Sequence, residues 1–155
     1  MKYICDGPGK QSWFRIETVG EAERESALMN HAVEKHFRRA REEAVQSYKP
    51  ATRVFIEQNI GLEPHIQKTM PLFLTLRNED GAALVTAMLP PGGRDDPSFR
   101  IIIVGAGNGD PYPGHQTAID ALGRQFGLTL DRERCFPYRR APYARASFSD
   151  GRTDT

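Results

Sequence analysis

The 155-residue sequence predicts a single α+β domain: a mainly antiparallel sheet with one long and one shorter helix packed on one of its faces. Three observations predict this class: a long helical stripe, a hairpin pattern after it, and a buried strand that leads into a second helix. The length agrees, because one domain of this size buries about two thirds of the surface that its extended chain exposes.

The long helix is expected from a capping box and an apolar stripe. Thr18 and Glu21 have the S/T-x-x-E spacing, in which side chains and backbone amides satisfy each other at a helix start. An apolar stripe then recurs at intervals of three and four residues. Its members are Met29, Val33, Phe37, Ala40, Ala44 and Tyr48. Pro50 ends the pattern, because the residue before a proline resists helical angles, so we expect one continuous helix to about Tyr48.

Alternating residues predict a first strand and a hairpin. Residues 13–17 alternate between two faces, as a strand requires. Residues 71–77 and 82–89 also alternate, and the stretch 78–81 between them ends in glycine, which favours a hairpin turn. Residues 52–68 show no clear period, and we expect them to begin as a strand and to end in an irregular connection.

The last strand and the second helix follow each other directly. Residues 101–104 are all apolar up to the glycine-rich turn, which is typical of a strand buried on both faces, so we expect this strand at the centre of the sheet. The second helix is expected over 113–126, and Gly127 and Leu128 have the character of a Schellman-type end. We therefore expect residues 1–131 to form the domain and residues 132–155 to form an extended arm whose end is disordered.

Composition excludes several classes of function. The net charge of +1 provides no global field for nucleic acid or an acidic membrane, and the apolar runs are too short to span a bilayer. Without a signal-like segment and with only two cysteines, we expect a cytoplasmic protein without disulfides. His31 and His36 do not predict a metal site, because five residues on a helix separate their directions by roughly 140° and place His31 on the polar face. We expect no metal and no cofactor.

A glycine-rich turn after the last strand is the first candidate site. Residues 100–131 resemble in part the dinucleotide-binding fingerprint of Rossmann-type proteins. Asp110 occupies the position of the third glycine, and Pro111 and Pro113 delay the helix, so we exclude dinucleotide binding. The turn can still receive an anion through its backbone amides, with a purely structural turn as the alternative. The residues of this anion site are Gly105, Gly107, Asn108, Gly109 and His115.

The arm is the second candidate, as an interface. Its arginines alternate with aromatic rings, the residue types that anchor protein contacts or stack on bases. The interface residues are Tyr138, Arg139, Arg140, Tyr143 and Arg145. The alternative is an arm folded over its own domain, with Phe136 and Tyr138 closing the core.

Three hypotheses for function follow from these sites. The first is a non-enzymatic domain that binds a ligand or a protein partner, with a homodimer as one form. The second is a small acyl-CoA- or phosphate-dependent transferase that uses residues 105–109 as its anion site. The third is an accessory nucleic-acid binder that uses the arm, which the small net charge disfavours. We prefer the first, and the sequence leaves open whether the chain is an enzyme.

Overall fold

The computed structural model of the chain describes residues 1–49, 61–136 and 148, and it confirms the α+β class. The strands form one sheet in sequence order, each antiparallel to the next: β1 (Lys2–Asp6), β2 (Ser12–Arg15), β3 (Leu72–Arg77), β4 (Ala83–Leu89) and β5 (Ile102–Val104). The described helices are α1 (Val19–Met29), α2 (Val33–Ser47), α3 (Leu62–Thr69) and α4 (Tyr112–Phe126). Two 3-10 turns, η2 (Pro91–Gly93) and η3 (Ala106–Asn108), precede and follow β5.

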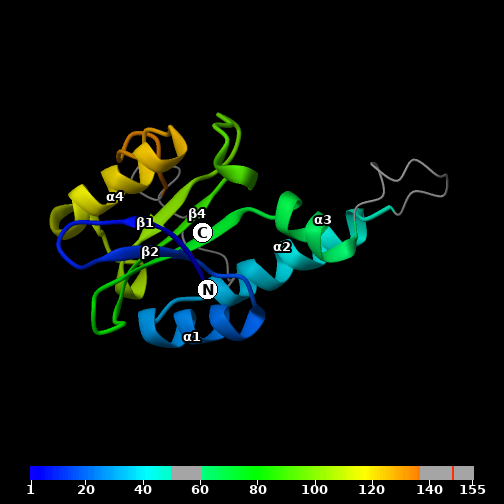
Figure 1. Ribbon diagram of the computed structural model, residues 1–155, viewed down its shortest axis with the longest axis horizontal. Coiled ribbons are helices and arrows are strands. Elements are labelled where there is room, and N and C mark those ends of the chain that lie inside the picture. Colours follow the sequence, from blue (N-terminus) through cyan, green and yellow to red (C-terminus); the bar gives the residue numbers. More distant parts are fainter. Residues whose placement is uncertain (50–60, 137–147, 149–155) are drawn as a thin grey trace, which may run out of the picture.

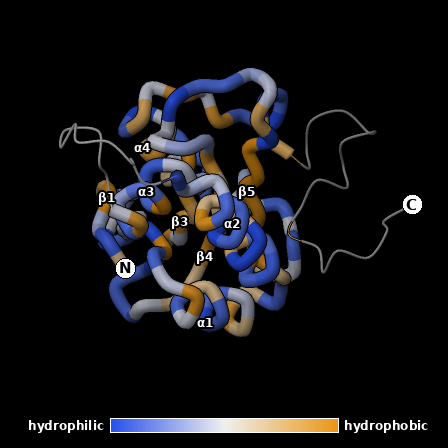
Figure 2. Tube along the Cα trace, turned by 90° about the vertical axis from the view of Figure 1, so that its right-hand side faces the viewer, coloured by the Kyte–Doolittle hydropathy of each residue, from blue (hydrophilic) through white to orange (hydrophobic). Residues whose placement is uncertain are grey.

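Helices cover both faces of the sheet, so the expectation of helices on a single face is wrong. Leu72, Leu74 and Leu76 of β3 belong to a core cluster with α4, whereas Phe73 belongs to a second cluster with α1, α2 and α3. Figure 1 shows α4 on one side of the strands and α1 on the other. Figure 2 shows the hydrophobic residues gathered on the strands between these helices. Every residue of β3 is buried, which requires cover on both sides.

The expected long helix is two helices, α1 and α2, joined by an elbow. Asn30 takes a left-handed conformation (φ 51°) after α1, and asparagine tolerates this region better than most residues. The Ser26 hydroxyl then accepts a hydrogen bond from the Glu34 amide at 2.9 Å and caps the start of α2. The apolar stripe is nevertheless buried at Met29, Val33, Phe37 and Ala44, because the elbow keeps both halves facing the sheet.

Local signals for helix ends and for the hairpin are confirmed. Thr18 and Glu21 form the capping box at the start of α1. Gly127 ends α4 in a left-handed conformation (φ 70°), and the Leu128 amide donates to the Gly123 carbonyl at 2.8 Å. Strands β3 and β4 pair across the turn that ends at Gly81.

Strand β5 lies at the end of the strand order, and the expectation of a central position is wrong. Its outer side is covered by Phe136, whose amide donates to the Ile101 carbonyl at 2.8 Å and whose carbonyl accepts from the Ile103 amide at 3.2 Å. Cys135 and Phe136 are buried, although the sequence places them in the arm. The first residues of the arm therefore complete the core beside β5.

Two elements were not expected. Strand β1 pairs with β2 at the other end of the sheet, where the sequence indicated no strand. Residues 62–69 form α3 in place of an irregular connection, while residues 52–60 lie outside the described residues. Within the described ranges, no helix has both the length and the apolar content that crossing a membrane requires.

Replacing Phe37 by alanine tests the core under α2. Phe37 is 2% exposed and packs edge-on against Phe73, with ring centroids 5.2 Å apart. We expect Phe37→Ala to lower the free energy of unfolding by about 3–5 kcal/mol, because it leaves a cavity. Val45→Ala on the same helix is the control, since Val45 is exposed, and its effect should stay within about 0.5 kcal/mol. Urea unfolding measures both, and equal effects would contradict this packing.

Candidate functional site

The glycine-rich loop closes on itself at η3. The Gly105 amide donates to the Gly109 carbonyl at 2.7 Å, and the Gly109 amide donates to the Ala106 carbonyl at 3.0 Å. Gly107 and Asn108 both have positive φ values, 63° and 60°. Two amides of the expected anion site are thus used within the loop, and anion binding there stays a prediction.

The Asn108 side chain pairs with the backbone of Phe148, which lies 40 residues further along the chain. Its Nδ2 donates to the Phe148 carbonyl at 3.1 Å, and its Oδ1 accepts from the Phe148 amide at 3.1 Å. The Ala32 amide, at the elbow, donates to the same carbonyl at 3.1 Å. These contacts hold the main chain at residue 148 and do not depend on its side chain.

The Phe148 ring is fully buried between two imidazoles. Its centroid lies 5.3 Å from the His31 ring and 5.3 Å from the His36 ring, with interplanar angles of 51° and 73°. Such tilted and edge-on contacts are the geometries that aromatic pairs prefer. We call Ala32, His31, His36 and Asn108, which all contact Phe148, the Phe148 site; Phe148 also belongs to the core cluster under α2.

A chain of buried polar groups links this site to the sheet. His31 Nε2 lies 2.9 Å from Thr86 Oγ1 on β4, and the Thr86 hydroxyl donates to Glu25 Oε2 at 2.5 Å. Glu25 Oε1 accepts from Arg77 Nη2 on β3 at 2.8 Å. Glu25 and Thr86 have no exposed surface. A charge this deep requires a partner, and Arg77 supplies it.

The hydrogen bonds of His31 define its protonation state. The Val33 amide donates to Nδ1 at 3.3 Å, so Nδ1 carries no proton and Nε2 donates to Thr86. Burial of the ring, together with the neighbouring His36 imidazole, lowers the pKa of His31 to about 4. The imidazole is therefore neutral at pH 7.

The order of these groups argues against nucleophile activation. A base that activates a hydroxyl must accept its proton and be free to do so. Here His31 donates its hydrogen bond to Thr86 and does not accept one from it. The Thr86 hydroxyl donates instead to the Glu25 carboxylate, which is already paired with Arg77. Arg77 also donates to Thr75 Oγ1 at 3.0 Å. This arrangement positions the elbow against the sheet.

The structure corrects the placement of one histidine and leaves other predictions untested. His31 was expected on a polar helix face, but the break at Asn30 turns it inward, where it is half-buried and hydrogen-bonded. His115 lies in the first turn of α4, and among the described residues no hydrogen bond joins its side chain to the loop. The expected interface residues, Tyr138, Arg139, Arg140, Tyr143 and Arg145, lie outside the described residues.

Sequence reasoning missed the buried polar chain, although a signal was present. Glu25 stands four residues before Met29, in phase with the apolar stripe, and a charge in that phase indicates burial. Arg77 occupies the buried end of β3 in the same way. Phe148 gave no periodic signal, because it is a single large apolar residue among small polar ones.

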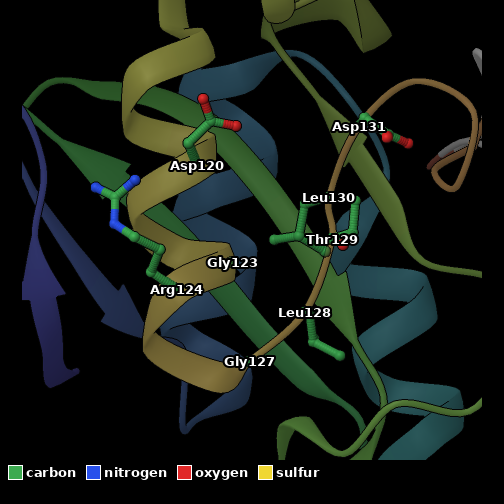
Figure 3. A pocket seen from close by; sticks show the side chains of 8 residues that line it. All are labelled: Asp120, Gly123, Arg124, Gly127, Leu128, Thr129, Leu130 and Asp131. Atoms are coloured by element: carbon green, nitrogen blue, oxygen red, sulfur yellow. The ribbon is translucent and has the colours of Figure 1, made fainter.

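An open hollow of about 500 Å³ lies beside the end of α4, between the helix and residues 127–131. Figure 3 shows that Asp120 and Arg124 project from the helix, while Asp131 lies at the far end of the neighbouring coil segment with its carboxylate pointing away from the helix. Ligand sites bring polar groups together around an apolar floor. The charged side chains of this hollow diverge, so it is a weaker candidate than the Phe148 site.

Comparisons with family models, curated proteins and solved structures give no match for this chain. In the described part of the chain, no three His, Cys, Asp or Glu side chains gather as a metal site would need. The proposal below therefore rests on the geometry of the Phe148 site.

Removing the Arg77 guanidinium tests the buried ion pair. We expect Arg77→Met to lower the free energy of unfolding by about 3–5 kcal/mol, because Glu25 then has no cation in a buried site. Arg38→Met is the control, since the pair of Arg38 with Glu34 is exposed and such pairs contribute about 0–1 kcal/mol. Chemical unfolding of both variants measures the difference, and a loss no larger than the control's would show that the pair is not needed.

Proposed function

We propose that this domain is a non-enzymatic binding module that holds a peptide segment by its main chain in the Phe148 site. One observation carries the proposal: a single side chain, Asn108, pairs with both main-chain groups of Phe148. Main-chain hydrogen bonds give affinity for an extended segment, and a side-chain pocket gives specificity. The imidazoles of His31 and His36 provide the side-chain contacts for the buried ring.

Two features support binding over catalysis. The polar groups behind the site satisfy one another, as described above. Burial raises the pKa of the Cys135 thiol to about 11, so this thiol is protonated at neutral pH and a poor nucleophile.

A second copy of this chain is the partner that we propose. Each copy carries both the site and its ligand, so two copies that exchange their Phe148 segments would keep every contact and form a closed homodimer. Glu42 and Glu43 are exposed on α2, the helix that begins at the site, and Arg145 precedes Phe148 by three residues. Pairs between these groups would add electrostatic complementarity to the exchange.

A peptide supplied in trans tests the binding function. In full-length Phe148→Ala protein the chain's own segment keeps only its main-chain hydrogen bonds. A labelled peptide with the sequence of residues 142–155 brings the ring as well, so in excess it should displace that segment in a fluorescence anisotropy titration. The same peptide with alanine in place of Phe148 should not bind. Adding Asn108→Gly should weaken binding about tenfold or more, because two buried hydrogen bonds are lost while the positive φ of Asn108 suits glycine.

Circular dichroism first establishes that the Phe148→Ala protein is folded, and Phe148→Leu replaces it if it is not. If the folded variant shows no binding to the peptide at millimolar concentration, the binding function is refuted.

Mixing two variants tests the exchange between copies. Asn108→Gly keeps an intact segment but has a weakened site, and Phe148→Ala keeps an intact site but lacks the ring. We expect wild type to show a molar mass above that of the monomer, rising with concentration, and each variant alone to remain smaller. Light scattering of the mixture should show a molar mass above that of either variant alone. In each mixed pair, the intact site of the Phe148→Ala chain can bind the intact segment of the Asn108→Gly chain. A wild-type protein that stays monomeric at all concentrations would contradict a homodimer.

A further inference from the structure

We propose that His31 makes the Phe148 site proton-dependent: the site holds an aromatic segment while this imidazole is neutral and releases it when the imidazole gains a proton. This inference rests on the proposed function and adds to it the residue that selects the ring and controls its release.

The position of His31 requires a neutral ring. It follows Asn30 at the elbow and stands two residues before the start of α2, where the Val33 amide donates to its Nδ1. A proton on Nδ1 would face another N–H donor and lose this hydrogen bond. The positive end of the α2 dipole also disfavours a cation there.

A backbone hydrogen bond at His31 itself raises its pKa, but burial lowers the pKa more, and the other groups packed around the ring do not reverse this. Thr86 on β4 accepts its Nε2 proton, and the charge of Glu25 on α1 behind Thr86 is compensated by Arg77 on β3. His36 on α2 lies across the Phe148 ring and adds no negative charge. Glu34, in the first turn of α2, is paired with Arg38, and the η3 side chain that contacts Phe148 is the neutral Asn108 amide.

The ring of the occupant completes the burial of His31. With Phe148 in place, burial lowers the pKa of His31 to about 4. An empty site readmits water, and the pKa then returns towards the ordinary value of about 6.5. The proton and the segment therefore compete, and the affinity for the segment is full above pH 6.5 and falls as the pH decreases towards 4.

A protonated imidazole would also attract the face of an aromatic ring, which opposes release. With centroids 5.3 Å apart and planes at 51°, the two rings are close enough for part of this attraction. The lost Val33 hydrogen bond and the desolvated charge act together in the other direction. The balance favours release in acid.

Binding of the peptide of residues 142–155 to full-length Phe148→Ala protein, at pH 7.5 and pH 5.0, tests the inference. We expect weaker binding at pH 5.0, by up to about 30-fold, the limit reached if the pKa returns from about 4 in the occupied site to the ordinary value of about 6.5 in the empty one. Adding His31→Gln should reduce this ratio to about threefold or less, because glutamine does not titrate. Adding His36→Gln should leave the pH dependence in place, which separates the two imidazoles.

The possible outcomes test the role of His31 separately from the proposed peptide-binding function. Absence of binding at pH 7.5 would refute the proposed function itself. Binding of equal strength at both pH values would leave the binding module standing and overturn the role of His31. A pH dependence that survives His31→Gln would also overturn it, because another group would then carry the proton.

Discussion

The buried carboxylate of Glu25 is the constraint on which the rest of this structure depends. One helix, α1, carries a charge with no exposed surface to a sheet face, where Arg77 of β3 and Thr86 of β4 are its hydrogen-bond partners among the described residues. These bonds fix where α1 lies and which way it faces, since removing either partner leaves a buried polar group unpaired. Through Thr86 they also reach His31, so the elbow and the start of α2 are held to the same strand.

The Phe148 site follows from that placement. The elbow brings the Ala32 amide and the two imidazoles to Phe148, and the closed loop after β5 brings Asn108 to the backbone of the same residue. The tight turn holds Asn108 at a positive φ, which aims its amide at the backbone of residue 148. The site is therefore assembled from two rigid elements, a condition that precise recognition requires.

Local patterns predicted the elements whose cause is local. The capping box at Thr18, the hairpin turn at Gly81 and the end of α4 at Gly127 depend on neighbouring residues, and all three are confirmed. The break at Asn30 escaped prediction, because Met29 and Val33 keep helical spacing across it. Cover on both faces and the edge position of β5 depend on contacts between distant segments, such as Phe136 with Ile101, which periodicity does not encode. Asn108 was named from the sequence as an anion ligand, whereas its observed partner is the Phe148 backbone, and no local signal joins residues 40 positions apart.

The most direct test of the account is hydrogen exchange at the Phe148 amide, followed by NMR in the full-length protein. This N–H donates to Asn108 Oδ1, so the account predicts slow exchange in wild type and fast exchange in Asn108→Gly. The amide of Ile103, which donates to Phe136 beside the core, is the internal control and should stay slow in both proteins. A Phe148 amide that exchanges as fast in wild type as in Asn108→Gly would show that the site does not hold its segment.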